Sequence, residues 1–503
     1  MGKKQNRAFG NAFVLALAIS LPAAAQGPGG NTPGSNGGGS SSGANLGAVT
    51  AVQQQLSQPG PNVTPQNSND PSFKGSLVRD KATAGVLPLT LDDAIQRGLR
   101  NNLGLILQGS SEKQANGQRL QQLQHLLPTA TGSVSYELEQ VNLAAYGLKF
   151  PGLNPIIGPF QVVDFRAYLT QNLVNLQAFE NYMSAKHNFE SAKLTAQDAR
   201  DLVVLTVGNA YLLCIADAAR IESVKATMDT SKVSLDQANA NHEAGTSPRL
   251  DVLRAQVDYQ NEQQNLIATT NQLAKDKLAL ARAIGLPLDQ QFTLSDAVPF
   301  AALETPDPDA AFHQALKSRK DLAASAEQVE AAKAGKKAAF DEQLPVASFS
   351  GDFGDLGTTP AHSHGTFTAT GQVSAPLLQI AKTHGDEQVA DAQYDQAKAR
   401  LSDQEQQVNA DVRDAILDIQ SSAKLVEATK SNVDLAREAL SEAQQRFKAG
   451  VADSLPVSQA LSADEQANDQ YISALYQHNV AKLALARALG AASTNYKDYV
   501  GGK

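Results

Sequence analysis

The sequence has few of the residues that cross-link a protein or fill a globular core. Its 503 residues include one cysteine and no tryptophan, and only 5% of them are aromatic. A single cysteine, Cys214, excludes an intramolecular disulfide, and its apolar surroundings indicate a small core residue. So few aromatic side chains disfavour a compact sandwich and favour long helices rich in alanine, glutamine and leucine.

Positive charge is scarce as well. The 42 lysine and arginine residues are outnumbered by 51 acidic residues, and no basic stripe is visible. The electrostatic pattern of a nucleic-acid-binding protein is therefore missing. The sequence contains no phosphate-binding loop, no GxSxG nucleophile elbow and no HExxH, and the pair His362 and His364 has no further ligand at a suitable spacing. We expect no nucleic-acid partner, no cofactor, no metal and no enzymatic activity.

Long apolar runs are also missing beyond the N-terminus. Basic residues, an apolar run over 8–21 and small residues at Ala23 and Ala25 predict a signal peptide over 1–25. That run is shorter than the roughly 20 residues of a spanning helix, so we expect no transmembrane helix. Residues 26–87 are rich in Gly, Ser, Asn and Pro and predict a disordered tether.

The rest of the chain repeats itself. A shift of 205 residues places Gly245 on Gly450, Gly285 on Gly490 and the segment KLALARA on itself. We therefore predict one structural repeat over 88–285, a linker over 286–306, a second repeat over 307–490 and a short tail over 491–503.

Within each repeat the apolar period changes from helical to two. Alternation predicts strands near 130–142 and 161–172 in the first repeat, and near 346–356 and 365–375 in the second. Each repeat thus reads as helix, β-hairpin, long helix, turn and helix. The long helices hold about 69 residues, or about 100 Å, and two shorter helices placed end to end match that length.

The alternating strands most simply belong to a soluble sheet with one face on a core. A secretion signal, strands of membrane-spanning length and the lack of any apolar segment to cover them favour a membrane barrel instead. Four strands cannot close a barrel, so several chains would share one. The strand residues expected to face lipid are Val163, Phe165, Leu169, Phe349, Phe353, Phe367 and Val373.

These patterns together resemble the TolC-like outer-membrane efflux protein family. The resemblance rests on "NHEAGTSPRLDVLRAQVDY" with "KLALARAIG", on "RFKAGVADSLPVSQALSAD" with "KLALARALG", on "LTLDDAIQRGLRNN" and on the "LLP" before the first hairpin. It covers about 88–491, including the duplication. It implies a mainly α fold with a small β part, in which a homotrimer forms a shared β-barrel in the outer membrane and an α-helical barrel in the periplasm.

The same resemblance implies a channel-tunnel that connects an inner-membrane pump and a periplasmic adaptor to the outside. Each Ala-Gly turn would be a periplasmic tip at which the adaptor docks and the tunnel opens. The implied docking residues are Ala244, Gly245, Thr246, Leu250, Ala449, Gly450, Val451 and Leu455. Glycine suits the left-handed end of a helix, and Ser247 before Pro248, or Asp453 or Ser454 before Pro456, suits the start of the next.

Acidic residues after the tip would restrict the tunnel entrance in such a family. The first repeat has Asp251 there, but the second has Pro456 and Gln459, so the pair of aspartates is incomplete. Asp453 and Asp464 are the substitutes, and a solvated surface role is the simpler reading for any one of them.

Two other functions remain open at this point. A periplasmic coiled-coil adaptor or structural protein would also contain helical hairpins, although an adaptor usually has one hairpin inside small β-domains. A general diffusion porin fits less well, because the chain has only four strands and so much helix.

Overall fold

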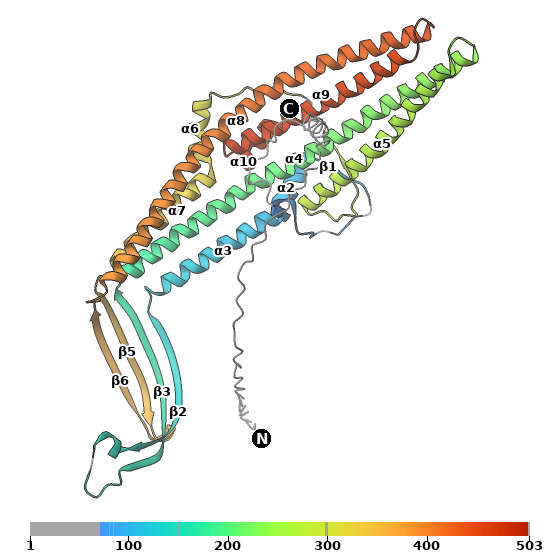
Figure 1. Ribbon diagram of the computed structural model, residues 1–503. Helices are drawn as coiled ribbons and strands as arrows, with labels where there is room; N and C mark the ends of the chain where they lie inside the picture. Colours follow the sequence, from blue (N-terminus) through green and yellow to red (C-terminus); the bar gives the residue numbers. More distant parts are fainter. Residues whose placement is uncertain (1–70, 80, 84, 149, 297–299, 501–503) are drawn as a thin grey trace, which may run out of the picture. The chain divides into compact units, whose positions relative to one another are not determined.

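The computed structural model describes residues 71–79, 81–83, 85–148, 150–296 and 300–500. The expected signal peptide (1–25) and residues 26–70 of the expected tether lie outside this part. Helices dominate, and four longer strands form one sheet, as the fold class requires (Figure 1).

Both repeats show the predicted order of elements (Figure 1). The first contains α2 (Leu91–Asn101), α3 (Leu103–Gln124), β2 (Thr129–Asn142), β3 (Ile156–Val174), α4 (Leu176–Glu243) and α5 (Arg249–Ile284). The second contains α6 (Pro308–Ser318), α7 (Lys320–Asp341), β5 (Val346–Gly357), β6 (Ser363–Ser374), α8 (Ile380–Lys448) and α9 (Leu455–Ala488). The short helices α3 and α5 pack along the long helix α4, and α7 and α9 pack along α8.

The expectation of one continuous helix before each hairpin was wrong. The first is interrupted at Asn102, whose side chain accepts hydrogen bonds from the backbone N–H of Gly104 and Leu105 and so begins α3. Asn102 also donates from Nδ2 to the carbonyl of Phe73, at 2.6 Å. The second is interrupted at Arg319, which is extended and begins α7.

The C-terminal end of α5 contacts the first interruption, and the C-terminal end of α9 contacts the second in the same way. Asn101 Nδ2 donates to the carbonyl of Ile284, and Ser318 Oγ donates to the carbonyl of Leu489. The next residues, Gly285 and Gly490, have φ of +76° and +67° and lie against these interruptions so closely that a Cβ would meet atoms within 3 Å. Close approach, as well as chain reversal, therefore requires glycine after each KLALARA segment.

The expected tether, linker and tail contain more structure than the sequence indicated. The expected tether contains a 3-10 helix, η2 (Pro71–Lys74), whose Phe73 is buried. Strand β1 (Leu87–Leu89) pairs in parallel with β4 (Phe292–Leu294) of the linker. The tail forms α10 (Ala492–Val500), which packs on α9 and α4. These segments cover the middle of the helical part, so the ordered chain begins before residue 88.

The main core lies at this level. It includes Leu205, Tyr211 and Cys214 of α4, and burial raises the pKa of the Cys214 thiol to about 12. Among the described residues, α4 is the one helix long and apolar enough to cross a membrane, with an 18-residue window of mean hydropathy 1.8. Because 61% of that window is buried, its apolar side chains are accounted for by the protein core.

A buried ion-pair network joins the two repeats at the same level. Arg487 of α9 lies 2.8 Å from Asp198 of α4, and both side chains are less than a tenth exposed. Arg319 bonds to Asp321 and Asp411. Burial raises the pKa of Asp198 to about 6, although Arg487 opposes the shift. Because both partners of the Asp198–Arg487 pair are buried, removal of either one leaves an uncompensated charge.

Candidate functional site

The four-stranded sheet has one apolar and one polar face. Its strand order is β2-β3-β5-β6, and every pairing is antiparallel. Residues opposite each other share a face, so Phe353 lies beside Ala167 and Phe367, and Leu169 lies beside Ala130 and Gly351. The register places all the residues predicted to face lipid on this one face, namely Val163, Phe165, Leu169, Phe349, Phe353, Phe367 and Val373.

Most of these side chains are open to the surroundings. Phe353, Phe367 and Val373 are 68%, 77% and 73% exposed. Val163 is an exception, since its neighbours leave it only 5% exposed and it offers almost no surface. A contiguous exposed apolar face of this kind marks a contact with lipid or with another protein.

The opposite face is polar and held by charge. Arg166 of β3 bonds to Asp164 on its own strand, to Asp352 of β5 and to Thr366 Oγ1 of β6. The rows on either side carry Ser, Thr, Gln and Asp. Such a face suits contact with water, and the Arg166 cluster ties three strands together in register.

At the far end of the helices, each Ala-Gly turn has the same geometry. Gly245 and Gly450 have φ of +72° and +70°. In the first turn the N–H of Thr246 bonds to the carbonyl of Asn241, and in the second the N–H of Val451 bonds to the carbonyl of Arg446. With the bonds donated by the glycines, these are Schellman ends, which satisfy the last carbonyls of a helix.

All the predicted docking residues are exposed at these tips. The first tip presents Ala244, Gly245, Thr246 and Leu250, and the second presents Ala449, Gly450, Val451 and Leu455. Leu250 is 53% exposed and Val451 is 80% exposed. The single chain therefore leaves apolar side chains uncovered at both tips.

The predicted helix caps were partly wrong. Helix α5 begins at Arg249 after Pro248, and no side chain caps it. Ser454 does precede α9, but its hydroxyl makes no cap bond. It donates instead to Asp251 Oδ1 at 2.8 Å, which links the beginning of α9 to the first turn of α5.

The predicted gate residues occupy three different environments. Asp251 is 2% exposed and bonded to Ser454, whereas Asp453 is exposed at the second tip. Asp464 lies farther along α9, half-buried, where its carboxylate accepts a bond from Asn468. Burial raises the pKa of Asp464. One chain therefore does not bring the three carboxylates together.

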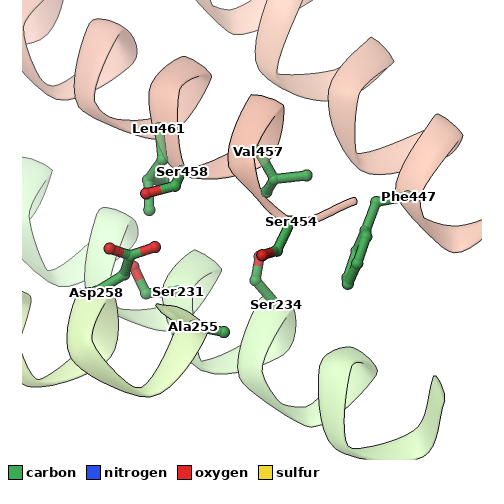
Figure 2. Close-up of a pocket in the computed structure, with 9 residues that line it drawn as sticks. All are labelled: Ser231, Ser234, Ala255, Asp258, Phe447, Ser454, Val457, Ser458 and Leu461. Carbon is green, nitrogen blue, oxygen red and sulfur yellow. The ribbon is translucent and has the colours of Figure 1, made fainter. Parts of the chain in front are cut away.

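The two helical hairpins, α4 with α5 and α8 with α9, both line a small cavity beside the Asp251–Ser454 bond (Figure 2). The first helical hairpin lines it with Ser231 of α4 and Asp258 of α5. The second lines it with Phe447 of α8 and with Ser454 and Val457. Its volume of about 10 Å³ is room for about one water molecule. Beside the bond lies a small apolar cluster that includes Ala255, Phe447 and Leu461. This cluster contains far fewer buried side chains than the main core.

The seam between α5 and α9 above this cavity is acidic. Glu262 is 8% exposed, and burial together with the nearby Glu465 raises its pKa to about 7. Asn265 Nδ2 donates to Glu465 at 2.5 Å. The carboxyl group of Glu262 therefore titrates near neutral pH, and its charged form destabilises the contact between α5 and α9.

The comparison with protein families decides the identity of the fold. The model of outer membrane efflux proteins matches residues 110–286 and again 311–491, once for each repeat. The chain belongs to the outer membrane efflux protein family. The two matches coincide with the duplication predicted from the sequence.

Individual members of this family and of its fold are distant in sequence. The chain is 24% identical over 310 residues, or 61% of its length, to the pyoverdine export outer membrane protein OpmQ of Pseudomonas putida. The alignment covers 66% of that relative, slightly under two thirds.

Solved structures show the same fold. The outer membrane protein VceC of Vibrio cholerae has a TM-score of 0.70 at 18% identity, covering 80% of this chain and 96% of its own. The Campylobacter jejuni CmeC outer membrane channel has a TM-score of 0.71 at 15% identity, covering 88% and 98%.

Proposed function

We propose that three copies of this chain form one exit duct through the outer membrane, open to substrates from an inner-membrane pump and a periplasmic adaptor. The observation that carries this proposal is the sheet. It exposes an apolar face, its other face is polar, and β2 and β6 at its edges have no outer partner among the described strands. Pairing β6 of one copy with β2 of the next closes three such sheets into a barrel and removes every edge from lipid.

The helical part supports the same assembly. Two equivalent tips per chain give six around one opening when three chains surround an axis. Family membership and the outer-membrane proteins among the relatives favour this function over a periplasmic adaptor. A water-lined duct of this kind contributes little selection among exported substrates.

The proposal predicts a detergent-resistant trimer in the outer-membrane fraction. In intact outer membranes, the strand residues 130–137 and 161–174 of one segment and 346–357 and 363–374 of the other should resist protease, because lipid covers one face and barrel closure protects the backbone. Mass spectrometry of the digested membranes would measure the protection. A soluble periplasmic monomer, or cleavage throughout both segments, would contradict the duct and favour the adaptor.

We propose further that the Asp251–Ser454 bond helps to hold the two tips of a chain together in the closed tunnel. It joins buried groups on different hairpins beside a small cavity, where a hydrogen bond to a carboxylate contributes about 1.5 kcal/mol or more. Adaptor contact at the exposed tips could then separate the hairpins at modest cost.

Ser454→Ala should accordingly raise the open fraction of the duct about tenfold, the change that about 1.4 kcal/mol gives. Single-channel recordings of purified trimers in planar bilayers measure this fraction as the open probability. Ser454→Thr keeps the hydroxyl and should behave like the unaltered protein. Ser458→Ala lines the same cavity without a bond to Asp251 and is the matched control. An equal open fraction in all three variants would show that the Asp251–Ser454 bond does not help to close the tunnel.

A further inference from the structure

At the end of the sheet away from the helices, the first β-hairpin (β2 and β3) extends far beyond the second (β5 and β6). The last pairing between β3 and β5 joins Val163 to Gly357, and β5 and β6 are connected immediately after it. In contrast, β2 and β3 continue to pair as far as Asn142 and Ile156 (Figure 1). We name residues 138–148 and 150–160 the outer extension.

The outer extension is unusually apolar for a segment in water. Six large apolar side chains in it are between 46% and 75% exposed, namely Leu138, Tyr146, Leu148, Phe150, Leu153 and Ile156. The connection between β5 and β6 exposes no large apolar side chain. From Gln140 to Gln161 the sequence contains a single charged residue, Lys149. Exposed loops are normally polar, so these side chains indicate a contact surface.

The backbone of the extension is also unpaired on one side. Over 156–162, the edge of β3 that β5 covers lower in the sheet has no strand partner among the described residues. The hairpin changes direction where its register shifts between Glu139 and Val141 (Figure 1). Gly158, with φ of +114° and a Cβ position 2.7 Å from the carbonyl oxygen of Glu139, allows the close approach of strands there.

The extension lies beyond the level at which the second β-hairpin ends. On the apolar face below it, Asp355 of β5 lies opposite Phe165, and Gln161 lies opposite Leu138. On the same face, Val134 and Leu138 of β2 are 72% and 70% exposed. Polar groups therefore interrupt the apolar surface on β3 and β5, while β2 continues it to the extension.

We propose that the outer extensions of three copies contact one another above the external opening and narrow it. The inference rests on the proposed trimer, in which each copy contributes one extension around the same opening. Tethering on one barrel raises the effective concentration of the extensions to about the millimolar range, so even a weak apolar contact forms. Between residues 138 and 160 the sequence has two charged residues of opposite sign, Glu139 and Lys149, so three extensions repel one another little.

Disulfide formation between copies tests the contact. Phe150→Cys in the full chain adds one exposed thiol, while Cys214 stays unreactive because it is fully buried. Mild oxidation of outer membranes should convert most trimers into species containing a disulfide-linked dimer. Thr358→Cys, exposed in the connection of the other hairpin, is the matched control and should remain monomeric on denaturing gels.

Function gives a second readout. Replacing Tyr146, Phe150 and Leu153 by serine should raise single-channel conductance several-fold in trimers whose tips are opened by Ser454→Ala. Absence of both the disulfide and the conductance change, in trimers that are intact on gels, would overturn the inference and leave the duct standing. Quenching of a dye at position 150 by nitroxide-labelled lipid would assign the extension to the membrane instead. Loss of the trimer itself would contradict the proposed function.

Discussion

Phe367→Arg is expected to eliminate the trimer from the outer membrane. Phe367 is 77% exposed on the apolar face of the sheet, opposite Phe353. An arginine near the middle of the bilayer on a lipid-facing strand costs about 2–4 kcal/mol. Three copies carry the change together, so the barrel loses roughly three times that amount, enough to compete with the total stability of a typical domain.

The adjacent residue provides a matched control. Thr368 lies on the polar face opposite Asp352, so Thr368→Arg places the same charge beside a carboxylate, in the interior of the proposed barrel. We expect this variant to assemble normally. Quantitative immunoblotting of outer-membrane fractions, without heating, measures both. If the two variants assemble equally well, the assignment of the faces is wrong.

The faces of the strands and the two tips were predictable because each rests on a local pattern. Alternation along β3 and β5 fixes which residues share a face, and the register in the structure agrees. The glycine of each Ala-Gly turn has a backbone conformation that few other residues adopt, so its position in the sequence predicted the end of a helix. The duplication was visible because both repeats preserve these same points.

The interruptions at Asn102 and Arg319 were not predictable in the same way. Asn102 ends one helix and begins the next, yet its flanking residues keep a helical period, and its bond to Phe73 comes from a segment expected to be disordered. The asparagine was the available signal, since it favours helix starts. Arg319 offered no such signal, because arginine is not among the residues that favour helix starts, and one of its two acidic partners, Asp411, lies on another helix.

The connection between the tips was missed for the same reason. Asp251 and Ser454 are 203 residues apart in the chain, and either one alone reads as a surface residue or a helix cap. The repeat alignment placed Asp251 opposite Pro456 and so drew attention to a missing aspartate. In the structure, Ser454 of the second helical hairpin donates its hydroxyl to Asp251 of the first, so the two tips contribute different partners to one bond.

Replacing Gly245 and Gly450 together by leucine is expected to reduce export to the level of a deletion strain while trimers remain in the membrane. A leucine at φ near +70° costs about 1–2 kcal/mol at each tip. Its Cβ meets no atom within 4 Å, so the hairpins still fold. Its bulk would point away from the chain, onto the surface where the adaptor is proposed to dock.

Two controls separate the causes of that loss. Alanine at both positions imposes similar backbone strain with little bulk, so export should be retained if the surface matters more than the strain. Gly117→Leu in α3 adds the same bulk at an exposed helical glycine that also has open space around its Cβ, and it should export normally. Susceptibility to exported compounds measures function, and crosslinking from Val451 to the adaptor measures contact. Normal export by the leucine pair would move the docking surface away from these tips, because six added side chains around one opening could not all be accommodated there without effect.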